Sequence, residues 1–281
     1  MFKSSRKKLI AIGCSFTEHH LTSSLSPNLN FDFPRWPQHL ADMLDMECVN
    51  LGKQGAGNDY ILAKTVDVML REKDVGLVVL MWSEWQRIGF QHYENWNIWN
   101  HFTPHYTDQD HSFVCASKLF DLQNPRHATR NALRTFIHAE KILRDVPYMF
   151  IQGTYNIFYY NVETLKTIDC QAGTPHENMN FNLVNNSRDQ SAKEMFACHD
   201  YFDYIENNVI GKFIGWPIMK ELGGYCISDV IEKPDPYRVW RPDPSKTTLT
   251  ISKDDSHPNA AGHKVIAELL YEKYKEIYNE H

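Results

Sequence analysis

A serine directly after a short apolar run is the first residue whose type and position could do chemistry. Lys8 to Gly13 predicts a buried strand that ends at a glycine, and Ser15 follows it in Gly13-Cys14-Ser15-Phe16-Thr17. A tight turn at the carboxyl end of a strand leaves backbone N–H groups free to point at a ligand. Turn or helix-capping duty is the commoner role of a lone serine there, so its position alone makes Ser15 only a candidate nucleophile.

A histidine with acidic neighbours lies near the other end of the chain. In Asp254-Asp255-Ser256-His257-Pro258-Asn259, Asp254 stands three residues before His257. A carboxylate on the same loop can hold the imidazole Nδ1 while Nε2 faces a nucleophile. The alternative is that the aspartates only form a turn and that His257 is a surface residue.

A glycine-rich segment follows the second apolar run and opens a helix. It reads Asn50-Leu51-Gly52-Lys53-Gln54-Gly55-Ala56-Gly57-Asn58-Asp59. Glycines there let the backbone approach a ligand and offer N–H donors to an anion. Because the spacing matches neither GxGxxG nor GK[ST], the segment favours one arm of an oxyanion hole over a phosphate cradle.

The elements that must position these segments alternate between strand and helix. Apolar spacing predicts strands at 8–13, 47–51, 75–81, 147–152 and 225–229, and helices at 36–46, 58–71, 128–144, 190–210, 212–222 and 259–278. Such alternation predicts an α/β fold of three α/β/α layers with a mainly parallel sheet. Two segments, about 84–126 and 154–189, do not fit the repeat, and we interpret them as insertions that wall the site within a single domain, 1–281.

Composition and charge exclude several classes of protein. The 281 residues carry 29 basic and 35 acidic side chains, a net charge of −6, which leaves no basic surplus for nucleic acid. The longest apolar run, 75–82, is far shorter than the roughly 20 residues of a membrane helix, and the short run before Cys14 is below the roughly 7–15 apolar residues of a secretion signal. We expect no nucleic-acid or membrane partner, reduced cysteines and a cytoplasmic location, or a virion if the chain derives from a phage; a homo-oligomer is left open.

The three segments, each at a predicted strand end, together resemble the SGNH subgroup of the GDSL esterase and lipase superfamily. The resemblance implies that Ser15 is the nucleophile, that Asp254 and His257 complete a catalytic triad, and that the N–H groups of Ser15 and Gly55 bind the oxyanion. It also implies the family's flavodoxin-like topology and hydrolysis of a small-molecule or glycan ester without a cofactor.

The third block departs from the family pattern. The family follows its third strand with GxND, whose asparagine is the last oxyanion donor, whereas this strand runs into Trp82-Ser83-Glu84-Trp85-Gln86-Arg87. Glu84 stands in place of the asparagine, and an ionised carboxylate would repel a developing oxyanion. Asn58, Ser83 or a tryptophan N–H are candidate substitutes. Chains that pair GCSFT with W-S/T-x-x-x-R resemble superfamily members from phages and marine bacteria, which favours a divergent branch.

An aromatic segment extends from Trp82 to Tyr106. Such segments stack on sugar rings, although packing in a core or an interface is the commoner role. With ester chemistry nearby, an acylated carbohydrate becomes a candidate substrate. The residues expected to bind it are Trp82, Ser83, Glu84 and Trp85.

Three functions stay open on the sequence alone. The first is a serine ester hydrolase, and the second is a non-catalytic module of the same fold that binds glycan or builds a phage particle. The third is a metal-dependent phosphate or phosphodiester enzyme using Glu18, Asp254 and histidines. The candidate histidines match no ligand spacing such as HExxH, so we expect no metal site; they are His19, His20, His92, His101, His105 and His111.

Overall fold

A parallel sheet forms the centre of the protein. The computed structural model describes residues 6–21, 23, 27–28, 31–85, 87–91, 99–102, 125–154, 191–219, 222–231, 249–252 and 255–278. Within these ranges five parallel strands pair in the order β2-β1-β3-β6-β7. They are β1 (Lys8–Ile12), β2 (Glu47–Asn50), β3 (Val75–Trp82), β6 (Tyr148–Gln152) and β7 (Phe213–Ile214). This is the flavodoxin-like order.

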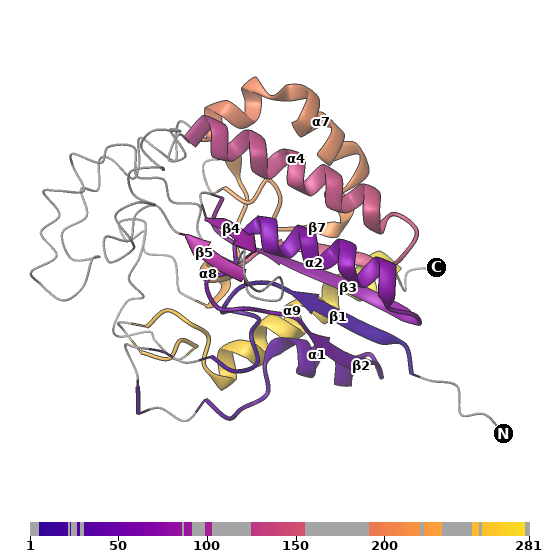
Figure 1. The fold of residues 1–281 in the computed structure, drawn as a ribbon, viewed down its shortest axis with the longest axis vertical. Helices are drawn as coiled ribbons and strands as arrows, with labels where there is room; N and C mark the ends of the chain where they lie inside the picture. The colour runs from indigo at the N-terminus through magenta and orange to yellow at the C-terminus, as the bar shows by residue number, and fades with distance from the viewer. Residues whose placement is uncertain are drawn as a thin grey trace, which may run out of the picture.

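Helices cover both faces of the sheet, which gives the three predicted layers (Figure 1). On one face α1 (Trp36–Met43) packs against α9 (Ala260–Tyr278). On the other face α4 (Pro125–Leu143) lies between α2 (Asn58–Arg71) and α7 (His199–Asn208). Shorter elements complete the described fold: a helical segment over 191–197, the antiparallel pair β4 (Ile88–Gln91) and β5 (Trp99–Phe102), the 3-10 turn η2 (Ile210–Lys212) and α8 (Ile227–Ile231).

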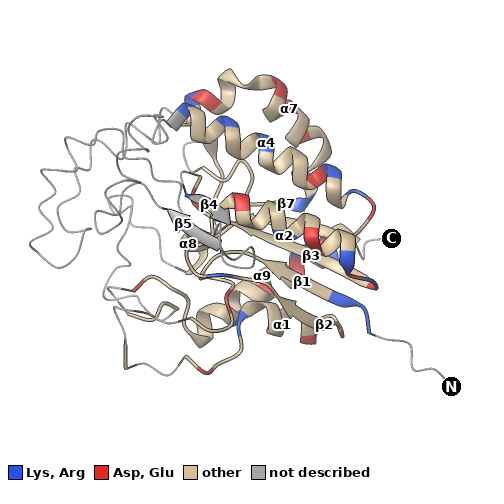
Figure 2. Ribbon diagram, in the orientation of Figure 1, with Lys and Arg blue, Asp and Glu red and all other residues tan. Residues whose placement is uncertain are grey.

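The middle strand β3 is apolar and buried on both faces, so it forms the centre of the sheet. Its sequence VGLVVLMW is buried from its second residue onward, as expected of a parallel strand covered on both faces. The Trp82 ring packs against Phe136 of α4 and Phe150 of β6, with ring centroids 5.0 and 5.4 Å apart. Charged residues lie along the covering helices, while the strands of the sheet are almost free of them (Figure 2).

Two predicted elements are wrong, and both lie between the predicted helices 190–210 and 259–278. A helix is predicted over 212–222, but within the described part of this range residues 213–219 form β7 and a series of turns. Gly215 has φ +83°, and Pro217 has no N–H to continue a helix. The predicted strand 225–229 instead enters α8, where the Asp229 carboxylate accepts the Cys226 N–H at 2.9 Å. The predicted helix 190–210 is confirmed with an interruption at Cys198.

The carboxyl ends of β1 and β3 lie side by side, at the point where the strand order reverses. Open α/β sheets bind ligands at such a switch point. The glycine-rich segment after β2 is bonded to the turn after β1: the Lys53 N–H donates to the Gly13 carbonyl at 3.0 Å. Asn50 Nδ2 also donates to the Thr17 carbonyl at 2.6 Å. These bonds fix the first two sequence blocks against each other.

Other features bear on the expected location and redox state. In the described part of the chain, no helix combines the length and the apolar character that crossing a bilayer requires. Cys14, Cys48 and Cys198 are free thiols, and the Cys226 Sγ lies 3.3 Å from Asp229 Oδ2. The remaining two cysteines lie outside the described residues. Most of the two predicted insertions also lies outside them.

Gly52 is a test of the contact between the first two blocks. A Cβ at this position would lie 2.5 Å from the Glu18 backbone nitrogen and 2.7 Å from the Thr17 carbonyl carbon. We expect Gly52→Ala to lower the free energy of unfolding by about 1–3 kcal/mol, measured by urea denaturation. Gly211→Ala is the matched control, because nothing lies within 4 Å of its added Cβ, and it should change stability by less than about 0.5 kcal/mol. Equal stability of the two variants would contradict this close contact.

Candidate active site

The Ser15 side chain projects from a tight turn at the end of β1. The N–H groups of Thr17 and Glu18 both donate to the Cys14 carbonyl, at 2.9 and 3.1 Å, which closes the turn around Ser15. Cys14 and Phe16 point inward and are buried, while Ser15 is partly exposed. Because its two neighbours point inward, the Ser15 side chain points outward at the switch point between β1 and β3.

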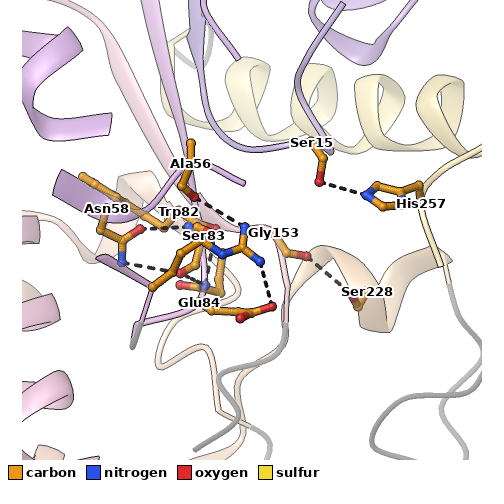
Figure 3. Close-up of polar contacts among 11 residues, drawn as sticks. Ser15, Ala56, Asn58, Trp82, Ser83, Glu84, Gly153, Ser228 and His257 are labelled. Carbon is orange, nitrogen blue, oxygen red and sulfur yellow. Dashed lines mark hydrogen bonds and ion pairs between the residues drawn. The ribbon is translucent and has the colours of Figure 1, made fainter. Parts of the chain in front are cut away.

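His257 faces Ser15 from the loop before α9 (Figure 3). The His257 Nε2 and Ser15 Oγ atoms are 2.8 Å apart. The loop that carries His257 is closed by a bridge between Thr250 and Pro258, and by a 2.9 Å hydrogen bond from the Ile251 N–H to the His257 carbonyl. The structure therefore brings together the serine and the histidine that the sequence singled out, and holds the histidine on a constrained loop.

The carboxylate that contacts His257 belongs to Asp255, which corrects the assignment of this role to Asp254. Asp255 Oδ1 lies 2.6 Å from His257 Nδ1 and also accepts the His257 N–H at 3.2 Å. A carboxylate that accepts the N–H two residues ahead forms an Asx-turn, and this turn places it beside the imidazole. Asp254 itself lies outside the described residues.

The Asp255 carboxylate is fully buried, and its surroundings keep it ionised. Burial raises the pKa of Asp255, but the hydrogen bond and positive charge of His257 and a hydrogen bond from Ser23 lower it by more, so the net shift is downward. An ionised acceptor at Nδ1 fixes the imidazole tautomer that leaves Nε2 free to take a proton from Ser15.

Two backbone N–H groups are candidate oxyanion donors. Among the described residues, neither the Ser15 N–H nor the Gly55 N–H donates a hydrogen bond to another protein group. Gly55 has φ +76° in a turn that the Ala56 N–H closes on the Lys53 carbonyl at 3.0 Å. A side chain there would be strained, which accounts for a glycine at this position.

Asn58, the suggested substitute for the missing family asparagine, is turned to a different task. Its Oδ1 accepts the Ser83 N–H at 2.9 Å, and its Nδ2 lies 3.4 Å from the Ser83 carbonyl. Figure 3 shows Asn58 and Ser83 together, apart from the pair of Ser15 and His257. Asn58 therefore anchors the end of β3 instead of pointing at the nucleophile.

The third block is buried, which corrects its expected role in substrate binding. The exposed fractions of Trp82, Ser83, Glu84 and Trp85 are 0, 0, 3 and 4%. Gln152 of β6 also holds the block: its Nε2 donates to the Ser83 carbonyl at 2.7 Å, and its Oε1 accepts the Trp85 Nε1–H at 3.2 Å. These buried residues therefore do not offer a surface to a substrate.

Glu84 forms an ion pair with Arg87, a partner that the sequence did not predict. Burial raises the pKa of Glu84, while the charge and hydrogen bond of Arg87 oppose that rise. Arg87 Nη2 donates to Glu84 Oε1 at 3.0 Å, and Nη1 donates to the Ala56 carbonyl at 3.4 Å, next to Gly55. The repulsion expected between Glu84 and an oxyanion is therefore offset by Arg87.

The metal hypothesis receives no support from the part of the chain that the structure describes, where no group of three or more histidine, cysteine or acidic side chains is placed to hold an ion. Glu18 instead accepts the Gln54 N–H at 2.7 Å, and burial raises its pKa. The rings of His19 and His20 contact each other with centroids 4.3 Å apart. His92, His105 and His111 and the side chain of His101 lie outside the described residues.

No protein-family model and no curated protein matches this chain. Among solved structures it is similar to a protein assigned to the lipolytic G-D-S-L family from Desulfitobacterium hafniense, with a TM-score of 0.44, 12% identity and coverage of 95% of this chain and 99% of that one. A member of the lipolytic protein G-D-S-L family from Veillonella parvula has a TM-score of 0.39 and 12% identity over 98% and 100%. A carbohydrate acetylesterase family member from Sinorhizobium meliloti has a TM-score of 0.44 and 11% identity over 97% and 99%.

The buried pair of Glu84 and Arg87 yields a stability test. Arg87→Met leaves an uncompensated buried carboxylate, so we expect a loss of about 3 kcal/mol at pH 7. Adding Glu84→Gln should restore at least half of that loss, because a neutral amide replaces the buried charge. Urea unfolding measures both.

The pH dependence of the Arg87→Met variant has a definite sign. A pKa of Glu84 raised above 4.5 in the folded state means that stability falls as pH rises from about that value. Without Arg87 the deficit should therefore be larger at pH 7 than at pH 5. A double variant no more stable than Arg87→Met, or a deficit independent of pH, would argue against a buried charged pair.

Proposed function

We propose that the chain is a serine ester hydrolase with Ser15 as nucleophile, His257 as general base and Asp255 as the orienting carboxylate. The single observation that carries this is the continuous arrangement of Ser15 Oγ, His257 Nε2, His257 Nδ1 and Asp255 Oδ1, with separations of 2.8 and 2.6 Å. A serine hydroxyl is a weak nucleophile until an adjacent base takes its proton. The resemblance of the sequence blocks to SGNH hydrolases supports the same chemistry.

The first half of the reaction acylates Ser15. The Ser15 Oγ attacks the ester carbonyl carbon as its proton moves to His257 Nε2, and the carbonyl π electrons move onto the oxygen. The N–H groups of Ser15 and Gly55 donate to that oxyanion. When the tetrahedral intermediate collapses, the alcohol leaves with the proton from His257.

The second half removes the acyl group. His257 takes a proton from water, the hydroxide attacks the acyl carbon, and collapse returns Ser15 Oγ and its proton with release of the carboxylic acid. The buried Asp255 carboxylate stabilises the imidazolium in both halves. Removing one oxyanion donor from a well-studied protease costs on the order of 10²–10³ in turnover, so two backbone donors are compatible with a working enzyme.

The proposed substrate class follows from the triad and from the aromatic segment. An ester of a small acid fits the chemistry of the triad, and an acylated carbohydrate is the candidate favoured by the aromatic segment. Of that segment, only the side chains of Trp82 and Trp85 are described, and both are buried. The glycan preference therefore rests on the sequence pattern between Phe90 and Tyr106.

Covalent labelling tests the nucleophile directly. A fluorophosphonate probe should modify Ser15, located by mass spectrometry of the labelled peptide, and hydrolysis of p-nitrophenyl acetate should accompany it. Ser15→Ala and His257→Ala should each abolish labelling without loss of folded structure, checked by circular dichroism. A well-folded wild-type protein that is neither labelled nor active on an ester panel would favour the non-catalytic glycan-binding or structural alternative.

The two adjacent aspartates provide a second, sharper test. Asp255→Asn should lower kcat by on the order of 10³–10⁴, as the corresponding change does in a serine protease, because the amide can favour the wrong imidazole tautomer. Asp254→Asn is the matched control, with the same chemical change one residue away, and should alter kcat by less than about threefold. A larger loss in Asp254→Asn than in Asp255→Asn would overturn the assignment of Asp255.

A further inference from the structure

The Asp255 carboxylate has a second contact on the side away from His257. The Ser23 hydroxyl donates to Asp255 Oδ2 at 2.5 Å, and this bond joins residues 232 positions apart in the sequence. Ser23 is 9% exposed and Asp255 is 1% exposed, so the bond is shielded from water. The carboxylate is thus held by one oxygen on the histidine loop and by the other on a separate part of the chain.

Resting on the proposed function, we infer that Ser23 is a positioning residue of the catalytic triad, which holds the Asp255 carboxylate in the orientation that His257 needs. The terminal torsion of an aspartate is broad, so a carboxylate bonded through one oxygen can rotate away from its partner. A donor on the second oxygen removes that freedom. Charge-assisted hydrogen bonds of this kind are stronger than neutral ones.

Arg35 bonds to described residues on both sides of Ser23. These residues, like Ser15, lie between β1 and α1. Arg35, 1% exposed, donates from Nε to the His19 carbonyl at 3.3 Å and from Nη2 to the Phe31 carbonyl at 3.2 Å, so it ties together positions on both sides of Ser23. Its Nη1 lies 3.4 Å from Nε2 of His263 in α9.

These contacts connect both ends of the triad to the same chain segment. The chain from β1 supplies the nucleophile at one end of the triad and the Ser23 hydroxyl at the other, while the loop before α9 supplies His257 and Asp255 between them. Burial of Arg35 against α9 holds the two chain segments in register. A displacement of either segment would therefore disturb the Asp255 carboxylate as well as the distance between Ser15 and His257.

The decisive variants are Ser23→Ala and Ser23→Thr, compared with Thr135→Val. The control removes another largely buried hydroxyl, one that donates to the Asn131 carbonyl at 2.9 Å within α4. With p-nitrophenyl acetate, Ser23→Ala should lower kcat about tenfold with KM unchanged, Ser23→Thr should recover most of it, and Thr135→Val should leave kcat unchanged. Wild-type kcat in Ser23→Ala would overturn the inference and leave the proposed hydrolase intact.

A spectroscopic measurement keeps the inference testable if no ester is turned over. The proton between His257 Nδ1 and Asp255 should give a strongly deshielded nuclear magnetic resonance signal in the wild-type protein. Ser23→Ala should move this signal upfield or broaden it, and Thr135→Val should not. An unchanged signal in Ser23→Ala would show that Ser23 serves packing alone and would overturn the positioning role.

Discussion

The 2.8 Å contact between Ser15 and His257 joins parts of the chain that are 242 positions apart, and the proposed chemistry depends on it. Misplacement of a reacting group by about 1 Å can cost 10²-fold in rate, so both loops need rigid supports. The start of α9 supplies one: a Cβ on Gly262 would lie 2.1 Å from the Leu249 carbonyl oxygen, which leaves room only for glycine where the helix meets the histidine loop. The other support is the bonding of the turn after β1 to the segment after β2.

The third block, at the end of β3, is held in place by buried hydrogen bonds and by an ion pair. Two buried amides, Asn58 and Gln152, hold the main chain of Ser83. A buried charge at Glu84 is costly unless it is paired, and Arg87 supplies the partner three residues later. The motif W-S-x-x-x-R thus supplies both members of the buried ion pair, and its arginine also reaches the carbonyl of Ala56 beside a proposed oxyanion donor.

The sequence was sufficient where the signal was local. Apolar runs predicted the β1, β2, β3 and β6 strands, and a serine and a histidine at strand or helix ends could be recognised without knowing their partners. It was insufficient where the answer depended on backbone geometry. Which of the adjacent Asp254 and Asp255 contacts His257 is decided by the Asx-turn at His257. It also could not reveal Ser23, because a bond across 232 positions has no local pattern. The helix predicted over 212–222 is wrong because two local signals conflict there. The prediction followed the apolar spacing and gave too little weight to Gly215 and Pro217, which interrupt a helix.

The two ends of the proposed relay differ in exposure, and this difference matches what acyl transfer requires. Ser15 is partly exposed and the His257 side chain is 26% exposed, whereas the Asp255 side chain is 0% exposed. Water and an ester must reach the serine end, because deacylation consumes a water molecule. The aspartate end must stay dry. Water bonded to the carboxylate would compete with the His257 Nδ1–H for its oxygens and would weaken the attraction between the carboxylate and the imidazolium. A hydroxyl from Ser23 satisfies the second carboxylate oxygen without admitting water, so the buried end of the relay is both charged and bonded through both oxygens.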